Sequence, residues 1–307
     1  MLSEHPCGKE SPCVAYTIYN PPKRPGHKTN DDDRREAAEF YEQRAYFTPY
    51  DQLPRTMAGH SGASQIAANN RHALWIPNFL ENGERLTIFI PGFPGAGKSY
   101  LSKLLLRQFP KKYNILLFTD LSENDGNFNE FLTKDVPKDD EHPDGKEKRL
   151  FKVTLTPENL SKITLDSVRR LSPDGVVMIF DDVDMIRNSK VRSMVDELMQ
   201  NVLTTGRGHE KHDGNGDIHV IVTSHALHNY NKTKTAIENS EYIALFPCST
   251  LYSQYVNMFK KIGLPLDLCD ATRATAKQEG IRQVIIRKTD PMYVICGPYI
   301  YLPYDDD

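Results

Sequence analysis

The chain has 307 residues, of which 39% are hydrophobic and 26% are charged, and its formal net charge is -3 at pH 7. This composition is typical of a globular protein with a buried core, and the length suits one large domain or two smaller ones. The acidic balance excludes a protein that coats nucleic acid by bulk positive charge, so any DNA partner must be held by a local basic surface.

Targeting signals are not evident in the sequence. No stretch approaches the roughly 18 consecutive apolar residues that span a bilayer, and the opening MLSEHPCGKESPC does not follow the pattern of a secretory signal. The five cysteines are odd in number and scattered, which indicates a reducing compartment. We therefore expect no membrane span and no secretion.

The composition and residue pattern of the sequence change near residue 84. Residues 1–84 are rich in Pro, Asn and charged residues, and only residues 31–45 suggest a helix. From Arg85 onward, short apolar runs alternate with helical patterns, which is typical of βαβ units and a parallel sheet. We expect an N-terminal extension of unassigned role at 1–84 and a second domain at 85–307.

Near-continuous apolar runs in the second domain suit strands that are buried on both faces. The expected core strands span residues 86–90, 114–119, 176–180, 218–223 and 241–246. The expected helices span residues 98–109, 157–171, 189–205 and 250–262. The charged run 134–149 reads as a solvated insertion loop, and 281–287 with 292–296 as a hairpin added to the sheet edge.

A phosphate-binding loop follows the first of these strands. The segment GFPGAGKS, from Gly92 to Ser99, matches G-x-x-x-x-G-K-[ST] between an expected strand and an expected helix. Glycines let successive backbone N–H groups turn toward phosphate oxygens at the positive end of the new helix. Lys98 would bridge the β and γ phosphates of ATP, and Ser99 would ligate Mg²⁺. The residues expected at the nucleotide are Gly92, Phe93, Pro94, Gly95, Ala96, Gly97, Lys98, Ser99 and Tyr100.

An acidic pair follows the strand at 176–180. Asp181 and Asp182 stand at its carboxyl end, where parallel sheets bind their ligands. Asp181 would hold the magnesium through water, and Asp182 would orient or deprotonate the attacking water. An isolated Asp-Asp pair after a strand would more often cap a helix, but the upstream phosphate loop favours the catalytic interpretation. We expect Asp184 to cap the following helix.

The strand at 218–223 leads into Ser224 and His225. If this strand lies between the phosphate-loop strand and the acidic strand, His225 faces the γ-phosphate and can sense it. A solvent-facing histidine at a strand end is the alternative interpretation.

Beyond these two motifs, a longer series of short segments carries a family resemblance. The series consists of IFDDVD, Gly206-Arg207, Thr223-Ser224-His225, Asn229-Tyr230, Thr233-Lys234-Thr235 and Phe246-Pro247. Together with GFPGAGKS, it resembles the HerA/FtsK superfamily and, within it, the genome-packaging ATPases of nucleocytoplasmic large DNA viruses and virophages. The resemblance covers about residues 85 to 302.

The resemblance implies a RecA-like ASCE P-loop NTPase core of the α/β class, assembled into a homo-oligomeric ring. It also implies ATP-driven translocation of double-stranded DNA into a preformed capsid, with capsid or portal-vertex proteins as candidate partners. The expected location is a viral assembly site in the host cytoplasm or nucleus, or the virion. Arg207 matches the family's arginine finger, which acts on a neighbouring subunit's nucleotide. Residues 1–84, 134–149 and 208–217 depart from the family pattern.

Three other functions share the phosphate loop. A small-molecule P-loop kinase needs neither the Asp-Asp pair nor a polar sensor on the next strand. A GTP switch usually carries Asn-Lys-x-Asp, whereas Asn231-Lys232-Thr233-Lys234 ends in lysine. A capsid-associated protein that binds ATP without mechanical work stays open as well.

Overall fold

The computed structural model divides into two compact units. One comprises Arg85–Ala244, and the other combines Met1–Glu84 with Leu245–Asp307. The structure describes residues 2–3, 13–19, 44–47, 64–67, 73–79, 84–120, 126–131, 133–135, 146–171, 175–205, 217–225, 230–290 and 292–303.

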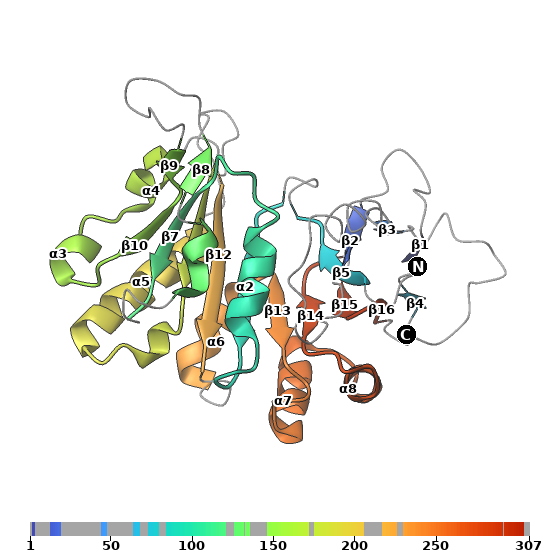
Figure 1. Cartoon of the computed structure of the whole chain (residues 1–307). Helices are drawn as coiled ribbons and strands as arrows, with labels where there is room; N and C mark the ends of the chain where they lie inside the picture. Colours follow the sequence, from blue (N-terminus) through green and yellow to red (C-terminus); the bar gives the residue numbers. More distant parts are fainter. Residues whose placement is uncertain are drawn as a thin grey trace. The chain divides into compact units, whose positions relative to one another are not determined.

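The unit Arg85–Ala244 is built on a parallel sheet (Figure 1). Its strand order is β10-β7-β11-β12-β6-β13, and every neighbouring pair is parallel. The strands are β6 (Thr87–Pro91), β7 (Asn114–Phe118), β10 (Leu150–Val153), β11 (Val176–Phe180), β12 (Ile218–Ser224) and β13 (Tyr242–Leu245). Every residue of β6, β7, β11 and β12 is buried, as the apolar runs predict.

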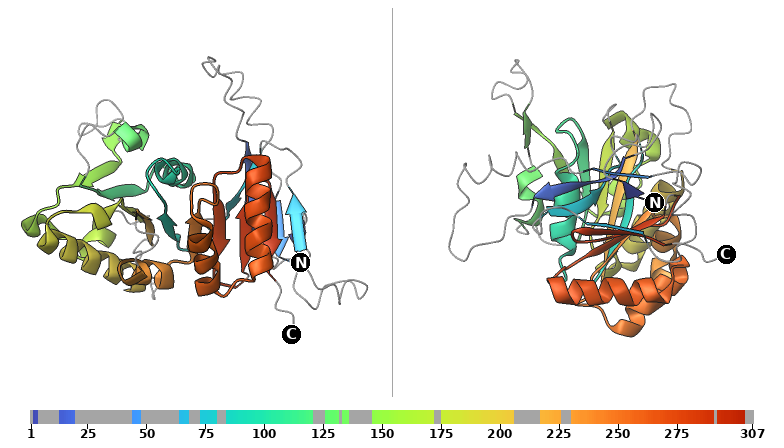
Figure 2. Two further views of the ribbon diagram at one scale, coloured as in Figure 1. Left: turned by 90° about the horizontal axis from the view of Figure 1, so that it is seen from below. Right: turned by 90° about the vertical axis from the view of Figure 1, so that its right-hand side faces the viewer.

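Helices cover both faces of this sheet. The chain moves from β6 toward β7 through α2 (Lys98–Leu106), but it moves back from β11 to β12 through α5 (Ser189–Thr205) and on to β13 through α6 (Tyr230–Asn239). Because such crossovers are right-handed, reversing the direction changes the face that the helix covers. Accordingly, α2 lies on one face, and α5 and α6 lie together on the other (Figure 2). This α/β architecture with a mainly parallel sheet is the expected P-loop NTPase fold.

The expected helix at 157–171 is two helices, α3 (Pro157–Leu160) and α4 (Leu165–Leu171). Thr156 caps the first by accepting the N–H of Asn159. Thr164 and Ser167 exchange side-chain bonds with each other's backbone N–H at the start of the second, in the manner of a capping box. Each helix therefore has its own N-terminal cap, and helical periodicity alone does not reveal the second cap, which separates α4 from α3.

The helix expected at 189–205 forms with those bounds as α5, but its cap differs from expectation. The N–H groups of Lys190 and Val191 donate to Asn188 Oδ1 at 3.0 and 3.2 Å, so Asn188 forms the cap that was expected of Asp184. Asp184 lies instead in the short 3-10 turn η3 (Val183–Met185). Because α5 begins at Ser189, Asn188 rather than Asp184 directly precedes its first turn.

The charged insertion contains more structure than a solvated loop. Its two ends pair as antiparallel strands β8 (Thr133–Asp135) and β9 (Lys146–Lys148), and a 3-10 helix η2 (Gly126–Phe131) precedes them. Residues 136–145 lie outside the described part of the chain.

The other unit joins N-terminal and C-terminal segments. The strands β1 (Leu2–Ser3), β3 (Arg44–Phe47), β2 (Cys13–Tyr19) and β5 (Ala73–Pro77) pair antiparallel in that order. A second antiparallel series runs β14 (Val284–Arg287), β15 (Tyr293–Cys296), β16 (Tyr299–Leu302) and β4 (Ser64–Ala67). Helices α7 (Tyr252–Ile262) and α8 (Leu266–Glu279) complete the unit.

The predicted hairpin therefore forms, with β16 as a further strand that was not predicted. The helix suggested at 31–45 falls mostly on residues outside the described ranges. Its last two residues, Arg44 and Ala45, belong to strand β3.

The two compact units of the structure do not coincide with the expected domains 1–84 and 85–307. The reason is that β2 and β5 share buried hydrogen bonds with the C-terminal hairpin. Trp75 Nε1 donates to the carbonyl of Pro298 at 2.9 Å, and the hydroxyl of Tyr293 donates to the carbonyl of Val14 at 3.0 Å. Among the described residues, no helix is both long and apolar enough to cross a bilayer.

Candidate nucleotide site

The phosphate loop connects β6 to α2 and has the backbone geometry that its glycines allow. Gly95 and Gly97 adopt φ values of 78° and 117°, a region that residues with a side chain rarely enter. The N–H of Gly92 donates to the carbonyl of Ser224 at 2.9 Å, which ties the start of the loop to the end of β12. Phe93 and Tyr100, at 36% and 39% exposure, are the large exposed side chains of this segment.

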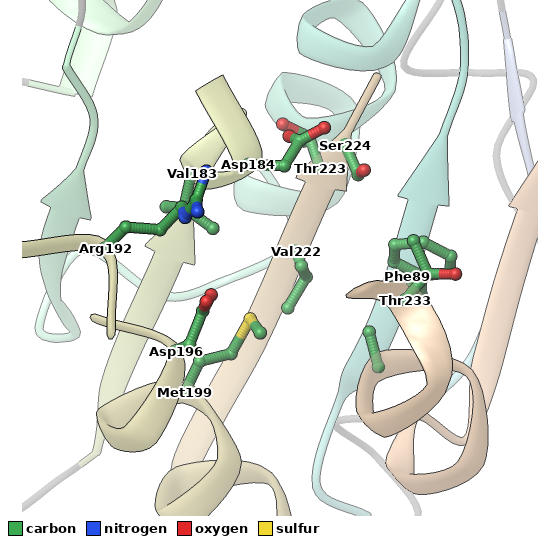
Figure 3. A pocket seen from close by; sticks show the side chains of 11 residues that line it. Phe89, Val183, Asp184, Arg192, Asp196, Met199, Val222, Thr223, Ser224 and Thr233 are labelled. Carbon is green, nitrogen blue, oxygen red and sulfur yellow. The ribbon is translucent and has the colours of Figure 1, made fainter. Parts of the chain in front are cut away.

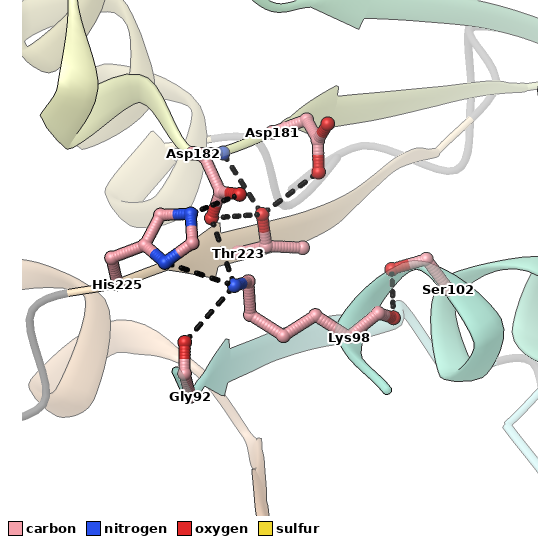
Figure 4. A network of polar contacts seen from close by, with 7 residues as sticks. All are labelled: Gly92, Lys98, Ser102, Asp181, Asp182, Thr223 and His225. Atoms are coloured by element: carbon pink, nitrogen blue, oxygen red, sulfur yellow. Dashed lines mark hydrogen bonds and ion pairs between the residues drawn. The ribbon is translucent and has the colours of Figure 1, made fainter. Parts of the chain in front are cut away.

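Lys98 is buried, and its ammonium group lies at the centre of the site (Figure 4). It donates to the carbonyl of Gly92 at 2.9 Å and lies 3.4 Å from His225 Nδ1. It also forms an ion pair with Asp182, with Nζ and Oδ1 3.5 Å apart. The loop, the acidic pair and the sensor candidate therefore meet at one amine.

The acidic pair emerges from the carboxyl end of β11. Asp181 is only 3% exposed, whereas Asp182 is half-buried. Asp182 has φ 48° and ψ 38°, and it is the only described non-glycine residue with a positive φ. Aspartate is one of the few residues that tolerate this conformation, which is uncommon and often found at functional sites.

His225 follows β12, which lies between β11 and β6 as the sensor hypothesis requires. Its Nε2 is 2.8 Å from Asp182 Oδ2. A neutral ring with its proton on Nε2 satisfies both contacts, because Nε2–H then donates to Asp182 while Nδ1 accepts from Lys98. His225 therefore faces the site rather than solvent alone.

Thr223 is a member of the site to which the sequence analysis assigned no role. Its side chain is fully buried, and its Oγ1 lies 2.9 Å from Asp181 Oδ1 and 3.1 Å from Asp182 Oδ1. The same oxygen accepts the backbone N–H of Asp182 at 2.9 Å. A polar β-branched residue beside the carboxyl end of a mostly apolar strand was the signal that could have identified it.

Magnesium would suit the oxygen ligands at this edge of the sheet. The Ser99 hydroxyl and the Asp181 carboxylate are hard oxygen donors, and Mg²⁺ usually keeps several water ligands beside one or two carboxylates. Over the described ranges, no group of three or more His, Cys, Asp and Glu side chains could hold a metal ion by itself. The donor set therefore fits a hydrated ion completed by phosphate.

Other predicted site residues are only partly described. Arg207 and Gly206 lie outside the described part of the chain, so the structure does not place the arginine-finger candidate. Of the Thr233-Lys234-Thr235 segment on α6, Thr233 is buried and Lys234 pairs with Glu238 at 3.8 Å.

A parallel α/β sheet with a phosphate loop after one strand and an acidic pair after another defines the class of P-loop nucleotide-binding proteins. The chain is 25% identical to "Uncharacterized protein V3" of Sputnik virophage over 219 residues, which are 68% of this chain and 74% of that protein. No protein-family model matches the sequence.

Solved structures add similarities at low identity. The genome packaging NTPase B204 of Sulfolobus turreted icosahedral virus 2, in complex with sulfate, matches with a TM-score of 0.39 and 13% identity, over 72% of this chain and 98% of that one. Its complex with AMP matches with a TM-score of 0.37 and 11% identity, over 70% of this chain and 98% of that one.

Proposed function

We propose that the protein hydrolyses ATP with Mg²⁺ and uses the energy to translocate double-stranded DNA, with genome packaging into a preformed capsid as the biological task. The observation that carries the hydrolytic part is the convergence of Lys98, Asp182 and His225. These residues follow three adjacent parallel strands, β6, β11 and β12, and they contact one another within 3.5 Å.

Each group has a role that its position supports. The backbone of Gly92–Ser99 and the Lys98 amine would hold the phosphates, and Ser99 with Asp181 would hold Mg²⁺, which offsets developing phosphate charge when bound. Asp182 would orient the attacking water, and its position between Lys98 and His225 fixes both of its carboxylate oxygens. His225 would sense the γ-phosphate through the amine and carboxylate that it contacts.

The motor part of the proposal rests on the motif series and on the similarity to a virophage protein. The partners that it implies are double-stranded DNA, further copies of this chain in a ring, and capsid or portal-vertex proteins. The chain is nearly neutral overall, so a grip on DNA requires basic residues gathered along a pore.

The decisive test is ATP hydrolysis by the assembled protein with and without double-stranded DNA. We expect DNA to stimulate hydrolysis in a salt-dependent and largely sequence-independent manner, because a motor grips phosphates without reading bases. Lys98→Ala should eliminate turnover, since the transferring phosphate loses a fixed counter-charge.

The control variant is Lys162→Ala, an exposed lysine on the turn after α3, which should leave both rates unchanged. If the rate of ATP hydrolysis is the same with and without DNA at low and moderate salt, the result would favour a kinase or a structural ATP-binding protein. Turnover retained by Lys98→Ala would contradict the assignment of the site.

A further inference from the structure

Thr223 is the side chain that touches both members of the acidic pair. Its hydroxyl bridges Asp181 Oδ1 and Asp182 Oδ1 and also accepts the backbone N–H of Asp182 (Figure 4). We propose that Thr223 is a positioning residue for hydrolysis, whose hydroxyl fixes the backbone and the carboxylate of Asp182 relative to Asp181. This inference rests on the proposed function, because it assigns to Thr223 the alignment of the proposed water-orienting group.

The backbone contact acts on a residue that needs support. Asp182 adopts a left-handed conformation, which costs free energy and persists only where the surroundings stabilise it. The bond from Asp182 N–H to Thr223 Oγ1 comes from the neighbouring strand β12 rather than from the turn itself. Thr223 therefore holds the turn that directs the Asp182 carboxylate toward Lys98 and His225.

The contacts of the Thr223 hydroxyl with the two carboxylates position the Asp182 side chain as well as its backbone. A threonine hydroxyl has a single proton, so at any moment it donates to one of the two carboxylates. The shorter distance, 2.9 against 3.1 Å, favours donation to Asp181 while Lys98 lies beside Asp182 Oδ1. When Lys98 turns to a phosphate, the same proton can turn to Asp182 and keep its carboxylate in place.

The surroundings of Thr223 permit a clean substitution. Thr223 lines a cavity of about 120 Å³ together with residues of β6, η3, α5 and α6, including Phe89, Asp184, Met199 and Ala236 (Figure 3). Valine has the shape of threonine and exchanges only the hydroxyl for a methyl group. Because valine keeps the shape of the side chain, we expect Thr223→Val to fold.

The experiment compares Thr223→Val and Thr223→Ser with the unmodified full-length protein. We expect kcat for ATP hydrolysis to fall about 10- to 100-fold in Thr223→Val, a size typical of supporting hydrogen bonds. KM should change by less than about threefold, because alignment matters in the transition state more than in binding. Thr223→Ser should restore kcat, since it keeps the hydroxyl. Hydrogen–deuterium exchange of the peptide containing Asp182 should speed up in Thr223→Val but not in Thr223→Ser.

Thr87→Val is the matched control. Thr87 is a buried threonine on β6 whose Oγ1 accepts the N–H of Glu241 at 2.9 Å, so the substitution removes the same kind of backbone bond. We expect it to leave kcat and the exchange of the Asp182 peptide unchanged.

Two results would overturn the inference: a folded Thr223→Val with unmodified kcat and unmodified exchange, or a Thr223→Ser as impaired as Thr223→Val. If the unmodified protein does not hydrolyse ATP, the proposed function fails on its own account. The exchange measurement then decides alone, and an Asp182 peptide that exchanges no faster in Thr223→Val refutes the role of Thr223.

Discussion

Asp182 is the residue on which the contacts of the site converge. Its Oδ1 faces Lys98, its Oδ2 faces His225, and its backbone N–H is held by Thr223. Asp181 is more deeply buried and contacts Thr223. The two adjacent carboxylates therefore have different surroundings, which supports different roles in hydrolysis.

Asp182→Asn should lower kcat by about 100- to 1000-fold, the size expected when a positioned general base is lost. Nucleotide affinity should change little, because asparagine keeps the shape and tolerates the left-handed backbone. Asp181→Asn should instead raise the magnesium concentration needed for half-maximal turnover. Steady-state kinetics across a magnesium titration measures both effects.

Asp184→Asn makes the same chemical change in the same segment and serves as the control. Asp184 has a buried Oδ1 without a hydrogen-bond partner, and no contact joins it to Lys98 or His225 in the described structure. It should keep kcat within about threefold of the unmodified protein. Unimpaired turnover in Asp182→Asn, with unimpaired magnesium dependence in Asp181→Asn, would show that the pair is wrongly assigned.

At the scale of elements, β6 and β12 are joined at both ends. The carboxyl ends meet through Gly92 N–H and the Ser224 carbonyl. The amino ends meet through the N–H of Leu86, which donates to His219 Nδ1 at 3.0 Å. His219 is buried against the rings of Phe109 and Tyr113, so the connection beneath the site depends on a neutral imidazole.

Burial, with the nearby Arg85 charge, lowers the pKa of His219 to about 3. An unfolded histidine has a pKa of about 6.5, so between these values the unfolded state binds more protons and stability falls as pH falls. Between pH 7 and 5 the loss attributable to His219 is about 2 kcal/mol. Above about pH 6.5 its contribution should be nearly flat.

Denaturant unfolding at a series of pH values measures this loss. His219→Gln keeps an acceptor but does not titrate, so its stability should depend less on pH over this window. Phe109→Leu should lower stability at every pH while keeping the pH dependence, because it removes a packing partner and not the titrating group. An equal dependence on pH in His219→Gln and the unmodified protein would contradict the prediction.

At the level of the whole molecule, the position of the end of α5 bears on how copies of the chain could share the proposed arginine finger, Arg207. The buried Arg85 donates to the carbonyls of Val202 and Leu203 in the last turns of α5, and to that of Ile218 at the start of β12. The end of α5 therefore lies near the amino ends of the strands, whereas the phosphate loop follows the carboxyl end of β6, about 16 Å along the strand. Arg207 is two residues beyond Thr205, which adds at most about 7 Å of chain. We therefore propose that Arg207 acts on a neighbouring copy's nucleotide.

Mixing two inactive variants tests that arrangement. Lys98→Ala lacks a working phosphate loop and Arg207→Ala lacks the finger, so a mixed ring can pair an intact loop with an intact arginine across one interface. We expect ATPase activity to recover on mixing, because a guanidinium at the developing phosphate charge contributes about 10³ to 10⁵ in rate in related systems.

Mass measurements of the mixture first establish that mixed assemblies form. Mixing Lys98→Ala with the double variant Lys98→Ala/Arg207→Ala is the control, since no subunit then has an intact loop and activity should stay absent. Full activity of Arg207→Ala alone would refute the arginine finger, and no recovery in proven mixed rings would refute action in trans.

Elements and motifs with local signals could be predicted from the sequence. The five predicted core strands form within two residues of the predicted bounds, because each is a continuous apolar run. The glycines of the phosphate loop and the Asp-Asp pair are recognisable for the same reason, since neighbours in the chain carry the pattern. Even the hypothesis about His225 followed from a strand end.

Contacts between residues far apart in the sequence became visible only in the tertiary structure. The pairing of β12 between β11 and β6 brings Thr223 to both carboxylates, and no local pattern assigns the partner of a lone hydroxyl. The N-terminal strands were missed because their partners lie far along the chain, as with Trp75 at Pro298. A local sequence pattern specifies whether a segment forms a helix or a strand. Strand order and register arise from the packing of the whole chain, and they determine which residues become neighbours.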